Sequence, residues 1–174
     1  ALPIFGICGG FQMLGKKIKD PENLESSEKE VEGLGLFDFE TTILSEKLTR
    51  QIQLETVNSR VFPMGIQCEG YEIHMGATTF GTDYQALFSS PNEDNPMNFG
   101  IINNEGTVIG TYLHGFLDQD QFRQNILRYM RSAKGIPEPQ SKFDYAQFKS
   151  KELNKLADLI KNSINLEAIE KKLL

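Results

Sequence analysis

A short apolar run that leads into a glycine-flanked cysteine constrains the fold of this chain more than any other feature. Residues 2–7 form the run, which overlaps the sequence Gly6-Ile7-Cys8-Gly9-Gly10. This is the G-x-nucleophile-x-G pattern of a nucleophile elbow, in which a buried strand turns sharply into a helix. Such a turn strains its central residue, and side chains beside that residue would collide with neighbouring strands. The pattern predicts a strand, a tight turn and a helix that continues to Ile18; the alternative is a buried structural cysteine.

The elbow and the two histidines of the chain form a candidate nucleophile and base. Cys8 would lie at a helix N-terminus, where the macrodipole favours a thiolate, and the N–H of Gly9 can stabilise an oxyanion. His114 directly follows an apolar run, at the carboxyl end of a predicted strand, where the active sites of α/β proteins gather. His74 is bracketed by glycines, and either histidine can equally be a core residue. Cys68 has no elbow around it, and we interpret it as a bystander.

The remainder of the chain alternates between strand and helix patterns. Six strands are predicted, over residues 37–44, 51–57, 67–75, 84–88, 99–102 and 107–113, with a hairpin at 103–106 and a turn between Pro91 and Pro96. The acidic stretch 20–32 is predicted to be a solvated loop. Asp118 is a candidate N-cap for a helix that ends near Gly135. A second helical region is predicted over residues 143–174, with the apolar face Tyr145, Phe148, Leu153, Leu156, Leu159 and Ile160.

Composition limits the classes of function. The 174 residues are 39% hydrophobic and 24% charged, with a net charge of −6. This is a globular composition, and its acidic balance argues against a nucleic-acid or anionic-membrane partner. The sequence has no apolar run long enough to span a membrane and no signal peptide, and its two cysteines make no disulfide framework. We therefore expect a soluble protein in a reducing, cytoplasmic setting.

Two kinds of ligand site are disfavoured by motif spacing. The cysteines and histidines do not form the close pairs that zinc sites use, so no metal site is expected. The chain also lacks a Walker phosphate loop, so ATP is not expected to bind to it by that device.

Three motifs resemble those of one family, the glutamine amidotransferase domain of the cobyric acid synthases. They are Gly6-Ile7-Cys8-Gly9-Gly10-Phe11-Gln12-Met13-Leu14-Gly15, Gly70-Tyr71-Glu72-Ile73-His74-Met75-Gly76 and Gly110-Thr111-Tyr112-Leu113-His114-Gly115-Phe116-Leu117-Asp118. The elbow alone is typical of any class I glutaminase. The second and third motifs narrow the resemblance to the cobyric and cobyrinic acid synthases, and the tail over residues 153–160 favours the cobyric members.

The resemblance implies an α/β domain of the class I glutamine amidotransferase type, which is flavodoxin-like with three layers. It would occupy residues 1–134, and residues 135–174 would form a linker and a C-terminal helical extension. The chain opens at Ala1, without a Met, inside its own apolar run. We therefore expect a piece of a longer polypeptide, with the earliest strands of the domain upstream.

The resemblance also implies an activity. Enzymes of this family are similar in carrying an N-terminal ATP-binding domain, which uses ATP and Mg²⁺, and a glutaminase domain without a cofactor of its own. Together they amidate four carboxylates of adenosylcobyrinic acid a,c-diamide, a corrinoid on the path to adenosylcobalamin. The glutaminase domain would hydrolyse glutamine with Cys8 as nucleophile and His114 as base. Gly9 would donate to the oxyanion, and Gln12 and His74 are candidates for lining the glutamine site; Gln12 can instead make a packing contact, as can His74.

Two implications concern what the chain lacks. The second oxyanion donor of the family lies on a glycine-rich loop upstream of the elbow, and losing one donor costs on the order of 10²–10³ in rate, so we expect little activity from this chain alone. Other class I glutaminases have His-Pro-Glu, whose Glu orients the imidazole, whereas His114 is followed by Gly115-Phe116. Glu72 and Asp118 are the candidates for that role, and the sequence does not decide between them.

Four alternatives remain open from the sequence. They are a cobyrinic acid a,c-diamide synthase, the glutaminase partner of a cell-wall amidating ligase, a stand-alone thiol hydrolase on the same fold, and an inactive interaction module. The helical tail counts against the ligase partner, and the presence of both Cys8 and His114 counts against the inactive module.

Overall fold

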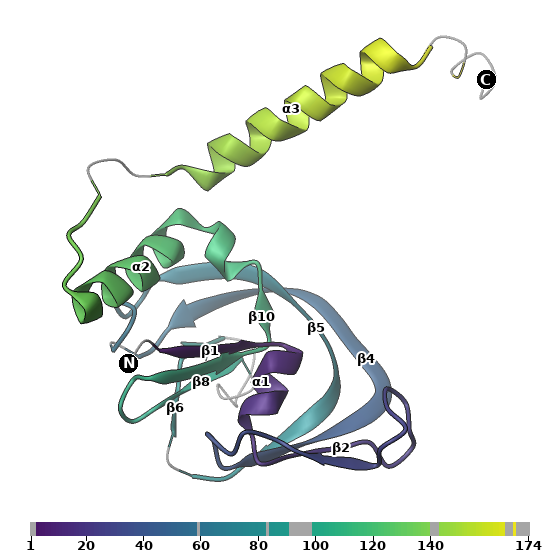
Figure 1. Cartoon of the computed structure of the whole chain (residues 1–174), viewed down its shortest axis with the longest axis vertical. Helices are drawn as coiled ribbons and strands as arrows, with labels where there is room; N and C mark the ends of the chain where they lie inside the picture. The colour runs from purple at the N-terminus through teal and green to yellow at the C-terminus, as the bar shows by residue number, and fades with distance from the viewer. Residues whose placement is uncertain are drawn as a thin grey trace.

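The computed structural model of the chain describes residues 3–58, 60–82, 84–90, 99–139, 143–165 and 169. The described strands form two sheets (Figure 1). The first sheet has the order β1-β9-β8-β6, from the strands Ile4–Ile7, Val108–Thr111, Gly100–Asn103 and Tyr84–Ala86. Strands β1 and β9 run parallel, whereas β8 is antiparallel to both of its neighbours. The parallel pair matters for function because the carboxyl ends of both strands meet at one edge.

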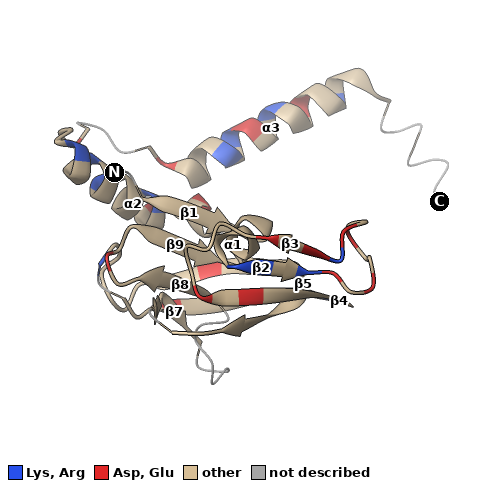
Figure 2. Ribbon diagram, turned by 60° about the horizontal axis from the view of Figure 1, so that its bottom comes forward, with Lys and Arg blue, Asp and Glu red and all other residues tan. Residues whose placement is uncertain are grey.

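The second sheet is built around two long strands, β4 (Phe39–Thr56) and β5 (Gln67–Phe80), which curve together around the body in Figure 1. The order is β10-β5-β4-β2-β3, and β7 also pairs with β4. The shorter strands are β2 (Lys17–Lys19), β3 (Glu30–Glu32), β7 (Phe88–Ser89) and β10 (Leu113–His114). Figure 2 shows the lysines of β2 beside acidic residues of β3 and β4. Because these ion pairs are partly exposed, they add little stability.

Four helical segments complete the described chain: α1 (Gly9–Leu14), η2 (Phe116–Asp118), α2 (Asp120–Lys134) and α3 (Tyr145–Ser163). Helix α2 packs on the core through Phe122 and Ile126. Helix α3 extends away from the sheets in Figure 1 and has no buried residue. Its first turn approaches the body through the backbone N–H of Tyr145, which donates to Asp120 Oδ1 at 3.1 Å.

Two aromatic clusters form the core. The larger one joins both sheets to α2, and within it the Phe122 ring contacts those of Phe62 and Phe88. The smaller one lies beneath α1, where the Phe11 ring packs edge-on against Phe39 and Tyr112, with centroids 5.1 and 4.9 Å away. The smaller cluster fixes the helix that begins directly after Cys8.

Several element boundaries differ from the sequence-based expectation. Helix α1 ends at Leu14, and Ile18 lies on β2, because the chain turns at Gly15 to pair with β4. The segments predicted as strands 37–44 and 51–57 are one strand, β4, whose pairing with β5 shifts between Thr42 and Lys47. The acidic stretch 20–32 is not wholly a loop, since its last residues form β3.

The predictions for the C-terminal half were partly correct. The hairpin at 103–106 is confirmed, with Gly106 at a φ of 77° between β8 and β9. The N-cap of α2 is Gln119 and not Asp118, which belongs to the short helix η2. The predicted apolar face of α3 exists, but it is not buried: Phe148, Leu153, Leu156, Leu159 and Ile160 are exposed. The turn at Pro91 and Pro96 and the end of the second helical region lie outside the described residues.

Candidate active site

Cys8 occupies a strained elbow between β1 and α1. Its backbone has a φ of 54° and a ψ of −117°, and only Asn23 shares a positive φ with it among the described non-glycine residues. A conformation of this kind costs about 1–3 kcal/mol and is typical of active sites. At Gly6 a Cβ would lie 2.6 Å from Gly10 O, so this glycine is required by close packing. The expectation that side chains beside Cys8 would collide with their neighbours is wrong at Gly9 and Gly10, where a Cβ would have no described atom within 4 Å.

The side chains of the elbow and its helix contact one segment of β5. Cys8 Sγ donates to Ile73 O at 3.3 Å, and Gln12 Nε2 donates to Met75 O at 3.0 Å. Gln12 is buried, and its amide nitrogen is hydrogen-bonded to a backbone carbonyl of β5. This contact matches the packing alternative for Gln12, and it also holds α1 against the strand that carries His74.

His114 lies on β10, shortly after the strand that pairs in parallel with β1. The Cys8 N–H donates to Thr111 O at 2.9 Å, which continues the pairing of β1 with β9, and His114 follows three residues later on β10. Its ring stacks on Tyr71 of β5, with centroids 5.0 Å apart and planes 9° apart. His114 Nε2 is buried without a hydrogen-bond partner among the described residues. The candidate nucleophile Cys8 and the candidate base His114 thus both contact β5.

The two carboxylates that the sequence offered as partners of His114 are placed elsewhere. Glu72 is 1% exposed, and its Oε2 lies 2.6 Å from Arg50 Nε. In the pairing of β10 with β5, Tyr71 and not Glu72 lies opposite His114. Asp118 is exposed on η2 and its Oδ2 lies 3.7 Å from Lys149 Nζ.

His74 packs against Tyr112, with ring centroids 3.8 Å apart, and its Nδ1 is buried without a partner in the described part of the chain. Burial lowers the pKa of His74, mainly because it disfavours the imidazolium; the charges of Arg50 and His114 add to this, against hydrogen bonds with the Met75 and Gly76 backbone. The neutral imidazole of His74 is therefore more favoured than in a solvent-exposed histidine.

Tyr112 was not singled out from the sequence, although it precedes His114 by two residues in a motif that was noted. Its hydroxyl lies 2.7 Å from Thr78 Oγ1, which in turn lies 3.1 Å from Thr41 Oγ1. Burial raises the pKa of the Tyr112 hydroxyl. Tyr112 thus stacks against His74 with its ring, while its hydroxyl joins a chain of threonine hydroxyls.

Cys68 lies in the larger core cluster at 1% exposure. Burial, with a smaller contribution from the charge of Glu69, raises the pKa of its thiol to about 12. The Cys68 thiol is therefore an inert core group, in agreement with its interpretation as a bystander.

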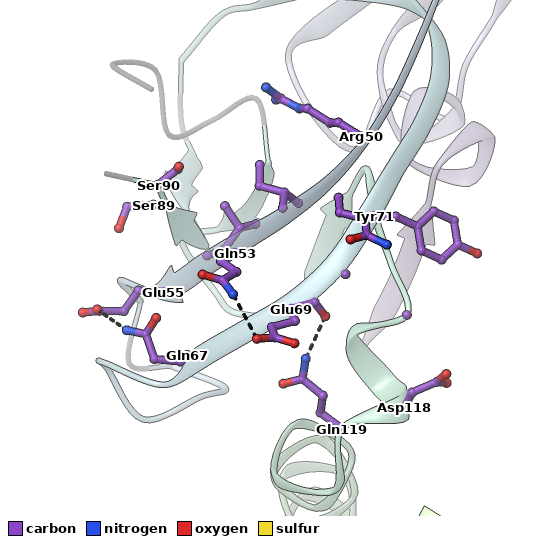
Figure 3. Close-up of a pocket in the computed structure, with 15 residues that line it drawn as sticks. Arg50, Gln53, Glu55, Gln67, Glu69, Tyr71, Ser89, Ser90, Asp118 and Gln119 are labelled. Atoms are coloured by element: carbon purple, nitrogen blue, oxygen red, sulfur yellow. Dashed lines mark hydrogen bonds between the residues drawn. The ribbon is translucent and has the colours of Figure 1, made fainter. Parts of the chain in front are cut away.

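A groove of about 1180 Å³ is lined mainly by residues of β4 and β5 (Figure 3). Tyr71 and Gly115 are among its lining residues, and Gly115 directly follows His114. Two hydrogen bonds join residues that line the groove: Gln53 Nε2 donates to Glu69 Oε1 at 3.1 Å, and Gln119 Nε2 donates to Glu69 O at 2.7 Å. The groove therefore adjoins His114, although neither His114 nor Cys8 lines it.

No group of three or more His, Cys, Asp or Glu side chains among the described residues is placed to hold a metal ion. None of the described helices combines the length and the apolar character that crossing a membrane requires.

Comparison with known proteins identifies the family. Residues 1–122 match the model of the CobB/CobQ-like glutamine amidotransferase domain. The chain belongs to this family. The resemblance predicted from the three motifs is therefore confirmed, and so is the class I glutamine amidotransferase fold class. The structure of PurLQS from Thermotoga maritima shares this fold, with a TM-score of 0.52 and 20% identity over 73% of this chain and 61% of that chain.

Cobyric acid synthases are among the relatives of this CobB/CobQ-like domain. One from Clostridium botulinum is 41% identical over 169 residues, and one from Dehalococcoides mccartyi is 43% identical over 172 residues. Each alignment covers 95% of this chain but only 34% and 33% of the respective relative. The chain thus spans about a third of the length of the curated relatives that it matches.

Proposed function

We propose that this chain is the glutaminase unit of a cobyric acid synthase. In this proposal it hydrolyses glutamine through a Cys8 thioester and supplies ammonia for amidation of adenosylcobyrinic acid a,c-diamide. The observation that carries the proposal is that Cys8, in a strained elbow after β1, and His114, three residues beyond the end of the parallel strand β9, both contact β5. The similarity to cobyric acid synthases supports the choice of acceptor.

The chemistry follows from the roles of two side chains. His114 takes the thiol proton of Cys8, and the sulfur attacks the side-chain carbonyl carbon of glutamine to form a tetrahedral oxyanion. The N–H of Gly9, an exposed residue, donates to that oxygen. The carbon–nitrogen bond then breaks, and His114 returns its proton to the nitrogen as ammonia leaves. Water attacks the thioester while His114 accepts its proton, and glutamate and the free thiol are released.

The division of the chain and its partners is part of the same proposal. Residues 1–134 would form the glutaminase domain, and residues 135–174 would form a linker and a helical extension. The sequence lacks a Walker phosphate loop, so ATP and Mg²⁺ would bind to polypeptide outside these residues, as would the corrinoid. We propose a cytoplasmic location, because the two cysteines of the sequence make no disulfide framework.

Substitution of each cysteine tests the proposal in the polypeptide as it is encoded, with whatever segments flank these residues. Glutamate release and corrinoid amidation would be measured with glutamine, ATP, Mg²⁺ and adenosylcobyrinic acid a,c-diamide. We expect Cys8→Ala to abolish glutamate release and to amidate the corrinoid only when free ammonia is supplied. Cys68→Ala is the matched control, because it removes a thiol from the core and should retain glutamine-dependent activity.

Three results would contradict the proposal. Glutamate release by Cys8→Ala at the wild-type rate would exclude the thioester mechanism. Glutamine hydrolysis by the wild type without amidation of any corrinoid would favour a stand-alone thiol hydrolase, and amidation of cobyrinic acid in place of its a,c-diamide would indicate the diamide synthase.

A further inference from the structure

An aromatic ring packs flat against the imidazole of His114, whereas the two carboxylates considered from the sequence, Glu72 and Asp118, lie beside cations. The Tyr71 ring lies parallel to it, with a 9° angle between the planes and 5.0 Å between the centroids. We infer that Tyr71 is a positioning residue, which fixes the plane of the His114 ring for proton transfer at Cys8. The inference rests on the proposed roles of Cys8 and His114, and it deepens them.

The backbone fixes the partners of this stack. In the antiparallel pairing of β10 with β5, His114 lies directly opposite Tyr71. Side chains in directly opposite positions have Cβ atoms about 4.5–5.5 Å apart, close enough for two flat rings to stack. The strands approach closely here, because a Cβ at Gly70 would lie 2.3 Å from His114 O. The pairing therefore presents Tyr71 to His114 whenever β10 is formed.

The charged neighbours have other partners. Glu72 forms its 2.6 Å ion pair with Arg50, and Asp118 lies 3.7 Å from Lys149. A stacked ring can restrict the rotation of an imidazole without adding a negative charge beside it. Tyr71 would thus supply the orientation that a glutamate supplies in a His-Pro-Glu motif, although not its charge.

The ring of Tyr71 can be removed without removing a core residue. Tyr71 is 47% exposed and belongs to neither core cluster. Figure 3 shows its side chain at one end of the groove, with the hydroxyl directed away from the other labelled residues. The proposed role therefore requires the aromatic face but not the hydroxyl, which separates two substitutions: Tyr71→Phe keeps the face, and Tyr71→Leu removes it.

The test measures kcat and KM for glutamine hydrolysis in the complete encoded polypeptide. Misplacing a catalytic group by about 1 Å can cost about 10²-fold in rate. We expect Tyr71→Leu to lower kcat between about tenfold and 10²-fold, with KM for glutamine near the wild-type value. Tyr71→Phe should retain wild-type kcat. Phe148→Leu is the matched control, since it removes a ring that is 45% exposed on α3, and should have no effect.

Three outcomes would overturn the inference: an unchanged kcat in Tyr71→Leu, an equal loss in Tyr71→Phe, or a change confined to KM. Corrinoid amidation with free ammonia, measured on the same variants, reports whether the polypeptide is folded. If Tyr71→Leu loses that reaction as well, Tyr71→Gln decides, because its polar side chain suits a half-exposed position and also lacks the ring. Full glutaminase activity in Cys8→Ala would instead refute the proposed function itself.

Discussion

Gly110 on β9 offers the sharpest test of how the elbow is supported. A Cβ at this position would lie 2.1 Å from Cδ2 and 2.5 Å from Cε2 of the Phe11 ring, whereas ordinary contact begins at 3.4 Å. Phe11 is fully buried and packs on Phe39 and Tyr112, so its ring cannot move aside without disturbing both. Overpacking of this kind costs about 1–3 kcal/mol, and we expect Gly110→Ala to lower the free energy of unfolding by that amount.

Gly10→Ala is the matched control for this prediction. A Cβ at Gly10 would have no described atom within 4 Å, and the residue lies inside α1. Alanine is favoured over glycine within a helix by up to about 1 kcal/mol, so this variant should be as stable as the wild type or more stable. Urea unfolding followed by circular dichroism measures both. Equal midpoints for Gly110→Ala and the wild type would refute the argument that Phe11 is immobile in its packing.

Two further predictions concern stability outside the elbow. The carboxylate of Asp20 accepts hydrogen bonds from the N–H groups of Leu24 and Glu25 at 2.8 Å, and these lower its pKa below 3.8. The contribution of the ionised carboxylate to the free energy of unfolding is therefore present above pH 3.8 and is lost as the pH falls through the lowered pKa. Asp20→Asn should flatten the acid limb of a profile of stability against pH. Parallel profiles for the variant and the wild type would contradict this. Asp144 caps α3 by accepting from Gln147 N at 2.8 Å. We expect Asp144→Ala to destabilise the helix by about 0.5–2 kcal/mol, which hydrogen exchange would detect as faster exchange confined to α3; unchanged exchange there would count against the cap.

The elbow could be predicted because its signal is local. A strained turn, a close approach at Gly6 and the helix after Cys8 all depend on residues adjacent in sequence. The candidate role of His114 came from a general rule on the carboxyl ends of strands, and in the structure His114 follows three residues after the end of β9, the parallel partner of β1.

The features that sequence analysis missed depend on strand pairing. Tyr71 lies in a motif that was noted, but its contact with His114 follows from the register of β10 against β5, which the local pattern does not contain. Ile18 fits the apolar spacing of a helix, yet it pairs with β4, because tertiary contacts outweigh a short periodic signal. The apolar face of α3 was predicted correctly as a pattern, but a pattern cannot say whether anything covers it.

Because Cys68 is buried, its reaction with an alkylating reagent distinguishes folded from unfolded molecules of this chain. A thiol with a pKa of about 12 is almost entirely protonated at neutral pH, and it is also enclosed by the core. Because the chain has two cysteines, a folded molecule should take up one equivalent of an alkylating reagent, at Cys8, whereas an unfolded molecule takes up two. Intact mass spectrometry after a brief pulse of reagent would therefore count folded and unfolded molecules in the same sample, without any substrate.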